Sequence, residues 1–307
     1  MRMLGVGEID GAIRERVHSE EARAVLRPLD ALPQLVEDRG IPFCVRLIRP
    51  GGTTALKERH ACRRPGSRNP FLPPEPELLV GSLEPNHHIV LNKFNVLEHH
   101  ALLVTRDYKA QDRGLDGDDF QALATLLADA DGLAFFNSGP EAGASQPHRH
   151  AQWVPRHEVN CFGDLLLDEV IERVRARRCS PGDILPFLFQ LRRYASPRDT
   201  KATPSGSRLH DDYLAMSAAL RLLPPEPDAP MRPHNLLLTR RWMLLVPRPH
   251  PLERRSAVNA LGFAGALLAK TPAELETIRS IGPLEVLKGA GIPKADGAPE
   301  RANAEAM

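Results

Sequence analysis

The chain has 307 residues, of which 42% are hydrophobic and 26% charged, as is usual for a globular protein with one large domain or two smaller ones. Its formal net charge of +1 provides no global positive field that would favour nucleic acid as a partner. No apolar run resembles a signal peptide or is long enough to span a membrane, so we expect a cytoplasmic protein without a membrane partner. The cysteines are widely spaced and form no Cys-x-x-Cys pair, which argues against a disulfide framework or a zinc site: Cys44, Cys62, Cys161 and Cys179.

The first half of the chain predicts an alternation of short helices and strands. Mixed charge over residues 8–36 predicts two short helices that break near Pro28. Residues 50–76 are polar and rich in proline, so we expect a long loop there. The other elements predicted in this half are strands at 42–48, 87–97, 100–105 and 133–137, and a helix at 119–130 that Asp118 and Asp119 could cap.

In the second half, a glycine-rich turn at 138–144 precedes a predicted strand from His148 to Val154. Residues 235–238 and 242–246 predict a strand pair joined by a tight Thr-Arg-Arg link. The stretch 178–209 gives no clear pattern. Helices are predicted at 164–176, 211–223, 257–270 and 272–280, the last with Thr271 as its N-cap.

Runs of strands interrupted by a few helices indicate an α+β fold with a mostly antiparallel sheet and flanking helices. Proline clusters mark the candidate boundaries between parts of the chain. We expect an N-terminal and catalytic region over residues 1–210, a C-terminal region over residues 211–290 and a flexible tail over residues 291–307.

The segment His148-Arg-His-Ala-Gln152 carries the clearest chemical signal. Every second residue of a β-strand points to the same face, so His148, His150 and Gln152 would line one surface together. Two imidazoles and an amide on one face could bind a metal ion, hold a phosphate, or supply a nucleophile with its helpers. A His-x-His pair taken alone also occurs by chance and does not choose among these readings.

The turn before this segment favours phosphate chemistry over metal binding. Its glycines let the backbone approach a ligand, and successive N–H groups there can cradle an anion. A neutral imidazole nitrogen beside that phosphate could attack the phosphorus and form a phosphoramidate. Gln152 can hydrogen-bond a phosphoryl oxygen but cannot act as an acid or base, and glutamine is a poor metal ligand.

The stretch Gly143-Ala-Ser-Gln-Pro-His-Arg-His-Ala-Gln152 resembles the active-site strand of the histidine triad superfamily, in its transferase branch with glutamine at the last position. Within that branch the chain resembles the ATP adenylyltransferases, also called diadenosine tetraphosphate phosphorylases. The resemblance covers most of the chain. Three more segments carry it: Val90 to Val96 with His100 to Thr105, Phe136 to Pro140, and Asn235 to Arg248 followed by Ser256 to Gly265.

This resemblance implies a histidine-triad-like fold and the reversible phosphorolysis of diadenosine tetraphosphate to ATP and ADP through an adenylyl-histidine. By position, His150 is the nucleophile, His148 helps to hold it, and Gln152 contacts the transferred phosphoryl group. It implies small nucleotides and phosphate as partners, and a divalent cation such as Mg²⁺ held mainly by the substrate phosphates. The residues expected to bind nucleotide or phosphate are Lys57, Asn92, Lys93, Asn137, Gly143, Ala144, Ser145, Gln146, Asn235, Thr239 and Arg240.

Two alternative functions stay open at this point. Galactose-1-phosphate uridylyltransferases share the pattern Ser-x-Pro-His-x-His-x-Gln, and Pro147 and His234 depart from what we expect of an adenylyltransferase. The Cys-x-x-Cys pair that often holds the structural zinc of those enzymes is absent, and the Asn-Lys-Phe and distal segments favour adenylyl transfer. A nucleotide-binding protein without activity could also keep the same fold.

Several polar residues keep a plain structural interpretation beside the functional one. The cations of the predicted loop 50–76 could form a mobile lid over a polyphosphate or a solvated charged segment: Lys57, Arg59, Arg63, Arg64 and Arg68. On a strand, Lys93 would face away from Asn92 and Phe94. Thr239 and Arg240 could form an ordinary hairpin turn. We interpret the pairs His87–His88 and His99–His100 as ordinary strand and turn residues.

Overall fold

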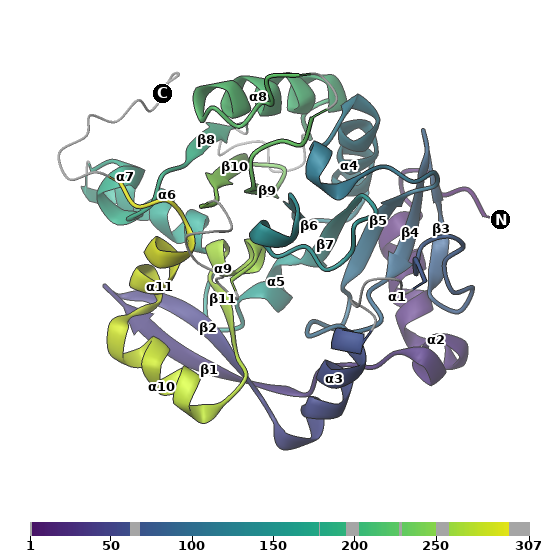
Figure 1. Ribbon diagram of the computed structural model, residues 1–307, viewed down its shortest axis with the longest axis horizontal. Coiled ribbons are helices and arrows are strands. Elements are labelled where there is room, and N and C mark those ends of the chain that lie inside the picture. Colours follow the sequence, from purple (N-terminus) through teal and green to yellow (C-terminus); the bar gives the residue numbers. More distant parts are fainter. Residues whose placement is uncertain are drawn as a thin grey trace.

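Figure 1 shows the computed structural model, which describes residues 2–61, 68–177, 179–194, 203–226, 229–249 and 258–294. An eight-stranded sheet forms its centre, and a three-stranded sheet lies to one side, next to the C-terminal helices α10 (Pro272–Ile281) and α11 (Pro283–Ala290). The predicted α+β fold with a mostly antiparallel sheet is confirmed. Among the described residues, no helix has the length and apolar character needed to cross a membrane.

The large sheet has the strand order β3-β4-β5-β7-β6-β9-β10-β8, and every neighbouring pair in it is antiparallel. β9 pairs with β6, so strands from both of the predicted regions, 1–210 and 211–290, lie in one sheet. Its strands are β3 (Leu79–Leu83), β4 (His87–Leu91), β5 (Ala101–Thr105), β6 (Gly132–Asn137), β7 (His150–Pro155), β8 (Gln190–Arg193), β9 (His234–Leu238) and β10 (Trp242–Pro247).

The small sheet joins the two ends of the chain. β1 (Ala31–Asp38) pairs antiparallel with β2 (Ile41–Ile48), and β11 (Ala266–Ala269) pairs parallel with β2. The remaining helices are α1 (Ile9–His18), α2 (Glu20–Val25), α3 (Thr53–Ala61), α4 (Gly117–Asp129), α5 (Arg156–Val159), α6 (Leu166–Arg177), α7 (Pro181–Ile184), α8 (Gly206–Ala219) and α9 (Ala260–Phe263), with 3-10 turns at Pro50–Gly52, Gln111–Arg113 and Pro140–Ala142.

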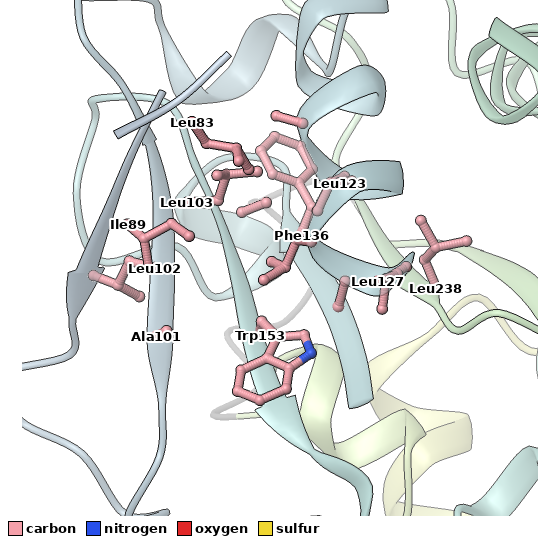
Figure 2. Close-up of a cluster of buried hydrophobic side chains, with 14 of the residues drawn as sticks. Leu83, Ile89, Ala101, Leu102, Leu103, Leu123, Leu127, Phe136, Trp153 and Leu238 are labelled. Atoms are coloured by element: carbon pink, nitrogen blue, oxygen red, sulfur yellow. The ribbon is translucent and has the colours of Figure 1, made fainter. Parts of the chain in front are cut away.

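One face of the large sheet packs against α1, α4 and α8 and forms the first hydrophobic core. Figure 2 shows Leu123 and Leu127 of α4 beside Phe136 of β6 and Leu238 of β9, with Trp153 of β7 nearby. These side chains are at most 1% exposed. The apolar stripe of α4 therefore fixes this helix across the middle strands of the sheet.

The opposite face of the sheet forms a second core with β2, α6, α9 and α11. Phe135 and Val154 from this face pack in the same cluster as Phe43 of β2 and Phe263 of α9. Because side chains alternate along a strand, His150 and Gln152 share the face of Val154. The residues with the strongest chemical signal thus lie between the two sheets rather than beneath α4.

The structure corrects the helices predicted over residues 8–36. α1 and α2 are separated at Ser19, whose hydroxyl caps α2 by accepting from the Ala22 N–H, and not near Pro28. Residues 31–36 lie in β1 and not in a helix. β1 pairs with β2 along its whole length, and such tertiary pairing overrides local helix propensity.

Other predicted boundaries also shift. The segment 50–76 is not one loop, because it contains α3, and the residues predicted as a helix at 257–270 include the short helix α9 and the strand β11. The strand predicted at 87–97 ends at Leu91. Asp116, not Asp118, caps α4, and Asp119 completes a reciprocal capping box with it. The hairpin β9–β10 and the Thr271 cap of α10 are confirmed, and the predicted tail lies outside the described residues after position 294.

Gly132 at the start of β6 should be intolerant of any side chain. A Cβ atom there would lie 2.3 Å from Nε1 of Trp153 and 2.5 Å from the carbonyl oxygen of Val154, both held in β7. We expect Gly132→Ala to lower the free energy of unfolding by about 1–3 kcal/mol in urea titrations. Gly11→Ala is the matched control, because its Cβ would meet no atom within 4 Å in α1, and it should stabilise by about 0.5–1 kcal/mol. Equal unfolding midpoints for the two variants would contradict this packing.

Candidate active site

A cavity of about 970 Å³ opens on the face of the sheet that carries Gln152. Its wall includes Gln152 of β7, the turn residues Gly143 to Ser145, and Asn92 and His100 at the adjoining ends of β4 and β5. The opposite wall is largely apolar and comes from α9, β11, α10 and α11, with contributions from Leu267 and Ile278. The sequence-predicted residues that line this cavity are Asn92, Gly143, Ala144, Ser145 and Gln152.

His150, the first residue of β7, is held in one tautomer by the backbone. Its Nδ1–H donates to the carbonyl oxygen of His148 at 2.8 Å, since a carbonyl can only accept. No described residue donates a hydrogen bond to Nε2, which therefore keeps its lone pair. Burial lowers the pKa of His150 to about 4, although the hydrogen bond to the His148 carbonyl opposes the shift. The ring is thus neutral near pH 7, as a nucleophile must be.

The rings of His148 and His150 both lie against Phe71, but their hydrogen-bond partners differ. The Nε2–H of His148 donates to the carbonyl oxygen of Thr105 at 2.8 Å, and its Nδ1 accepts from Nδ2 of Asn69 at 3.0 Å. Burial lowers the pKa of His148 as well. His148 precedes β7 and is fully buried, so it holds His150 through its backbone carbonyl while its ring anchors the chain. The ring of Phe71 lies 5.5 Å from that of His150 and covers it.

Gln111 is a site residue that sequence reasoning missed. The pairing of β6 with β7 ends at Phe135 opposite Gln152, two pairs before Asn137 and His150 would meet. Gln111 fills that gap: its Nε2 donates to the carbonyl oxygens of Asn137 and His150, and its Oε1 accepts from the His150 N–H at 2.8 Å. The Gln111 side chain thus replaces backbone hydrogen bonds between β6 and β7 beyond the end of their pairing. No local sequence pattern around Gln111 could indicate this role.

Arg149 points to the other face and ties the site to α4. Its Nη1 donates to Asp116 at 2.7 Å and to Asp119 at 3.0 Å, which form the capping box of that helix. Arg149 is 7% exposed; its ion pair with Asp119 is buried, whereas the Asp116 side chain is 43% exposed. Because a buried guanidinium needs both partners, this contact fixes the backbone of the His-Arg-His segment.

Gln152 is hydrogen-bonded to His100. Its Oε1 lies 2.9 Å from Nε2 of His100, whose Nδ1 lies 3.2 Å from Nδ2 of Asn92. His100 and Gln152 are 6% and 9% exposed, and all three residues line the cavity. From the sequence alone, His100 is interpreted as an ordinary strand or turn residue, because its distance of 52 residues from Gln152 hides the contact.

The turn before β7 contributes Pro140, Glu141 and Gly143 to Ser145 to the cavity wall. Gly143 has φ +98°, and a Cβ atom there would lie 2.8 Å from Cβ of Asn259. The Gly143 N–H donates to the carbonyl oxygen of Pro140, and the Ala144 N–H donates to the carbonyl oxygen of Gly139. These hydrogen bonds stabilise the turn from within. Ser145 lines the cavity beside them, whereas Gln146 follows in the chain without lining it.

Asn137 and Asn235 form a buried bracket behind this turn. Nδ2 of Asn235 donates to Oδ1 of Asn137 and to the carbonyl oxygen of Ala142, each at 2.8 Å, and its Oδ1 accepts from Arg248 at 3.0 Å. The amide of Asn235 is 0% exposed. Its hydrogen bonds are thus to protein groups, and the expected phosphate contact gives way to a role in shaping the turn. Burial lowers the pKa of Arg248 to about 10.

The two predicted lysines do not line the cavity. Lys93 forms an ion pair with Glu75, with Nζ 2.8 Å from Oε2, on the side away from Asn92 and Phe94. The strand ends at Leu91, and the alternation that places Lys93 opposite its neighbours persists. Lys57 is exposed on α3, directly after the cavity-lining Leu56. Of the other predicted lid cations, Arg68 is exposed, while Arg63, Arg64 and the side chain of Arg59 lie outside the described residues.

Thr239 and Arg240 lie at the end of β9 away from Asn235, and the structure does not bring them to the cavity. In the pairing of β9 with β6, Asn235 lies opposite Asn137 and Leu238 lies opposite Ala134. The turn after Leu238 is therefore at the end of β9 away from His150. The Thr239 hydroxyl accepts from the N–H groups of Arg241 and Trp242, and Arg240 donates to carbonyl oxygens at the end of α4. They form the plain hairpin turn that the sequence left open.

Comparisons with known proteins place this site in a class. A family model described as the ATP adenylyltransferase C-terminal domain matches residues 183–293, and one described as the Ap4A phosphorylase N-terminal domain matches residues 2–173. These matches define a nucleotidyltransferase. Because the second model covers more than half of the chain, the protein belongs to the Ap4A phosphorylase family, where Ap4A is diadenosine tetraphosphate. This favours the adenylyltransferase reading of the sequence over the uridylyltransferase one.

Two curated relatives come from Saccharomyces cerevisiae. Diadenosine tetraphosphate phosphorylase 2 is 28% identical over 247 residues, which are 69% of this chain and 72% of the relative. Protein APA1 is 27% identical over 260 residues, 76% of this chain and 79% of the relative. The fold is similar to the crystal structure of yeast Ap4A phosphorylase Apa2 in complex with Ap4A, with TM-score 0.73 and 21% identity, covering 95% of this chain and 100% of that one.

His150 should remain neutral through the physiological range. We expect its imidazole to titrate near pH 4, well below the ordinary value of about 6.5, because burial penalises the charged ring. The measurement is a histidine NMR titration from about pH 8 to about pH 3, with the His150 signal assigned by a His150→Asn variant. The unfolded chain takes up this proton first, so the same shift predicts stability that is lost as pH falls from about 6.5 towards 4. A His150 midpoint above about pH 6 would refute it.

Arg240→Ala should leave catalysis unchanged. Its guanidinium bonds only the α4 carbonyl oxygens of Leu127 and Ala128, on the far side of the sheet from His150. We expect kcat/KM for nucleotide phosphorolysis to stay within about twofold and stability to fall by about 1 kcal/mol. A tenfold or larger rise in KM would restore Arg240 as a phosphate contact.

Proposed function

We propose that this enzyme cleaves diadenosine tetraphosphate with inorganic phosphate to give ATP and ADP, reversibly, through an adenylyl group on His150. The observation that carries the proposal is the hydrogen bond from Nδ1–H of His150 to the His148 carbonyl, which leaves the Nε2 lone pair available. Family membership supports the reaction, and the Apa2 structures in complex with Ap4A and with AMP support small nucleotides as partners.

In the first step, Nε2 of His150 attacks the α-phosphorus of one adenylyl group. The bond from this phosphorus to the bridging oxygen breaks, and ATP leaves with that oxygen and its electron pair. Cationic charge that develops on the imidazole is shared with Nδ1–H, which the His148 carbonyl already accepts at 2.8 Å. The hydrogen bond thus strengthens as the phosphoramidate forms.

In the second step, an oxygen of inorganic phosphate attacks the same phosphorus. The phosphorus–nitrogen bond breaks, its electron pair returns to Nε2, and ADP leaves. Gln152 has no ionisable group that could take a proton from water, so the site offers no general base for hydrolysis at this position. Phosphate already carries a nucleophilic oxygen at neutral pH, which favours phosphorolysis.

The braced turn is the proposed cradle for the transferred phosphoryl group. Gly143, Ala144 and Ser145 line the cavity next to Gln152, and Gln146 follows them in the same turn. The N–H groups of Gly143 and Ala144 already donate within the turn, so the proposed donors to the phosphoryl oxygens are the Ser145 hydroxyl and the backbone N–H groups of Ser145 and Gln146. Asn137 is the proposed upstream nucleotide contact, and its side chain is buried under this turn.

A divalent cation, with Mg²⁺ as the first candidate, is proposed to arrive on the polyphosphate of the nucleotide. In the described part of the chain, no group of three or more His, Cys, Asp or Glu side chains could hold a metal ion. The protein residues therefore do not fit a metal cage of their own, and Mg²⁺ ordinarily keeps water and phosphate oxygens as ligands. Such a cation would supply charge neutralisation along the phosphates. Free nucleotides as substrates fit a cytoplasmic location, which we propose with them, without nucleic acid or membrane as a partner.

The covalent intermediate is the direct test of this proposal. Incubation with diadenosine tetraphosphate without added phosphate should leave one AMP on the protein, read by intact mass under non-acidic conditions and then located by peptide mapping. His150→Gly should abolish the adduct and lower turnover by at least about 10³-fold, because no other nucleophile replaces Nε2. His157→Gly, an exposed histidine in α5 just after β7, is the matched control and should keep both.

The same assay separates the alternatives. Parallel incubation with a UDP-sugar tests the uridylyltransferase, which would give a UMP adduct instead. Tight nucleotide binding by calorimetry with no adduct and no phosphorolysis, in the presence of Mg²⁺, would indicate a binding protein and overturn the proposal. Full turnover by His150→Gly would assign the nucleophile elsewhere.

A further inference from the structure

We propose that His100 is a positioning residue for the transfer reaction: with Asn92, it orients the Gln152 carboxamide so that Gln152 offers its N–H groups to the transferred phosphoryl group. This inference rests on the proposed function of the same site. It concerns a histidine whose sequence context indicated no role, and it changes the expected role of Asn92 from a direct ligand contact to an orienting one.

The contacts form a continuous line of hydrogen bonds that ends at Gln152. The backbone N–H of Phe94 donates to Oδ1 of Asn92 at 3.2 Å. Nδ2 of Asn92 lies 3.2 Å from Nδ1 of His100, and Nε2 of His100 lies 2.9 Å from Oε1 of Gln152. Each link is within ordinary hydrogen-bond distance.

The direction of donation along this line of hydrogen bonds is fixed by the backbone N–H of Phe94. A backbone N–H can only donate, so Asn92 must accept with Oδ1 and is left to donate through Nδ2. Nδ1 of neutral His100 must then accept, which places its proton on Nε2 and makes it a donor to Oε1 of Gln152. Nε2 of Gln152 is the group that remains, and none of the described residues accepts from it.

The orientation matters because the two ends of a carboxamide act oppositely on a phosphoryl group. The N–H end stabilises the negative oxygens of the transition state, and the C=O end repels them. Gln152 lines the cavity and shares its strand face with His150, which is 3% exposed and does not itself line the cavity. A glutamine without His100 could turn either end to the substrate and would lose part of this stabilisation.

The surroundings of His100 limit other positions for its ring. His100 is 6% exposed, and its ring packs 5.8 Å from that of Phe135 at a tilt of 51°. Phe135 is paired with Gln152 across β6 and β7, so the ring that holds His100 is fixed to the residue that His100 orients. The close packing around the imidazole therefore restricts it to one position, unlike a flexible contact on the surface.

The first experiment reads the tautomer directly and does not depend on activity. Long-range ¹H–¹⁵N NMR spectra of histidine-labelled protein, with His100 assigned by its loss in His100→Gln, should show a proton on Nε2 and none on Nδ1 of His100. A proton on Nδ1 in the neutral protein would overturn the inference, because Gln152 would then present its oxygen to the substrate.

The second experiment is a double-mutant cycle on single-turnover adenylyl transfer. We expect Gln152→Ala to slow the chemical step by about 100-fold and His100→Leu by about 10-fold, with little change in the nucleotide concentration for half-saturation. If His100 acts through Gln152, the double variant should be no slower than Gln152→Ala alone. Losses that multiply to about 1,000-fold would show an independent role and refute the inference.

Two further variants distinguish orientation from simple stability. His100→Gln retains an N–H donor for Oε1 of Gln152 and should recover most of the rate lost in His100→Leu. His88→Leu is the matched control, because His88 is a buried strand histidine, 9% exposed, that bonds Ser82 and does not line the cavity. It should lower the melting temperature without slowing transfer. If the wild-type protein forms no adenylyl adduct, the proposed function is contradicted. The NMR experiment still tests the tautomer of His100 independently of that result.

Discussion

The hydrogen bond from Nδ1–H of His150 to the backbone carbonyl of His148 is the interaction on which the rest of the site depends. It requires the chain to turn at the start of β7, and the neighbouring contacts secure that turn: Gln111 clamps the His150 backbone, and Arg149 is anchored to the α4 capping box. Burial then keeps the ring neutral, with a pKa lowered to about 4. The proposed nucleophile, 3% exposed, would thus owe its reactivity to tautomer and position rather than to an adjacent carboxylate base.

The cavity meets a highly charged substrate with little net charge of its own. Its charged lining residues are Arg46 and Lys270 against Glu141 and Glu274, and Arg46 already donates to the carbonyl oxygens of Glu158 and Val159. A polyphosphate must therefore be neutralised by dipoles, by a cation that it carries, or by cations that approach from α3. The position of Lys57, directly after the cavity-lining Leu56, is consistent with the third source.

Features that depend on neighbouring residues could be predicted from the sequence, whereas features that depend on residues far away in the chain could not. The strand that carries His150 and Gln152, the β9–β10 hairpin and the Thr271 cap are local, and alternation or capping chemistry sufficed for them, although β7 begins at His150 and not at the predicted His148. β1 was read as helix because its partner β2 decides its conformation. Gln111 and His100 contribute through contacts 39 and 52 residues away, which no single-sequence pattern encodes. Thr239 and Arg240 matched a family position, yet the hairpin register carries them to the opposite end of the sheet.

Adjacent histidines illustrate how the sheet separates chemistry that the sequence places side by side. His99 turns its Nδ1 to Glu158, whereas His100 turns to Asn92 and Gln152. The same principle connects the two functional side chains of β7. The state of His150 is set by a backbone carbonyl, which can only accept, and the orientation of Gln152 is traced to a backbone N–H, which can only donate. Since neither main-chain group can reverse its polarity, the fold itself determines which nitrogen of His150 keeps its lone pair and, in the proposed reaction, which end of the Gln152 amide faces the phosphoryl group.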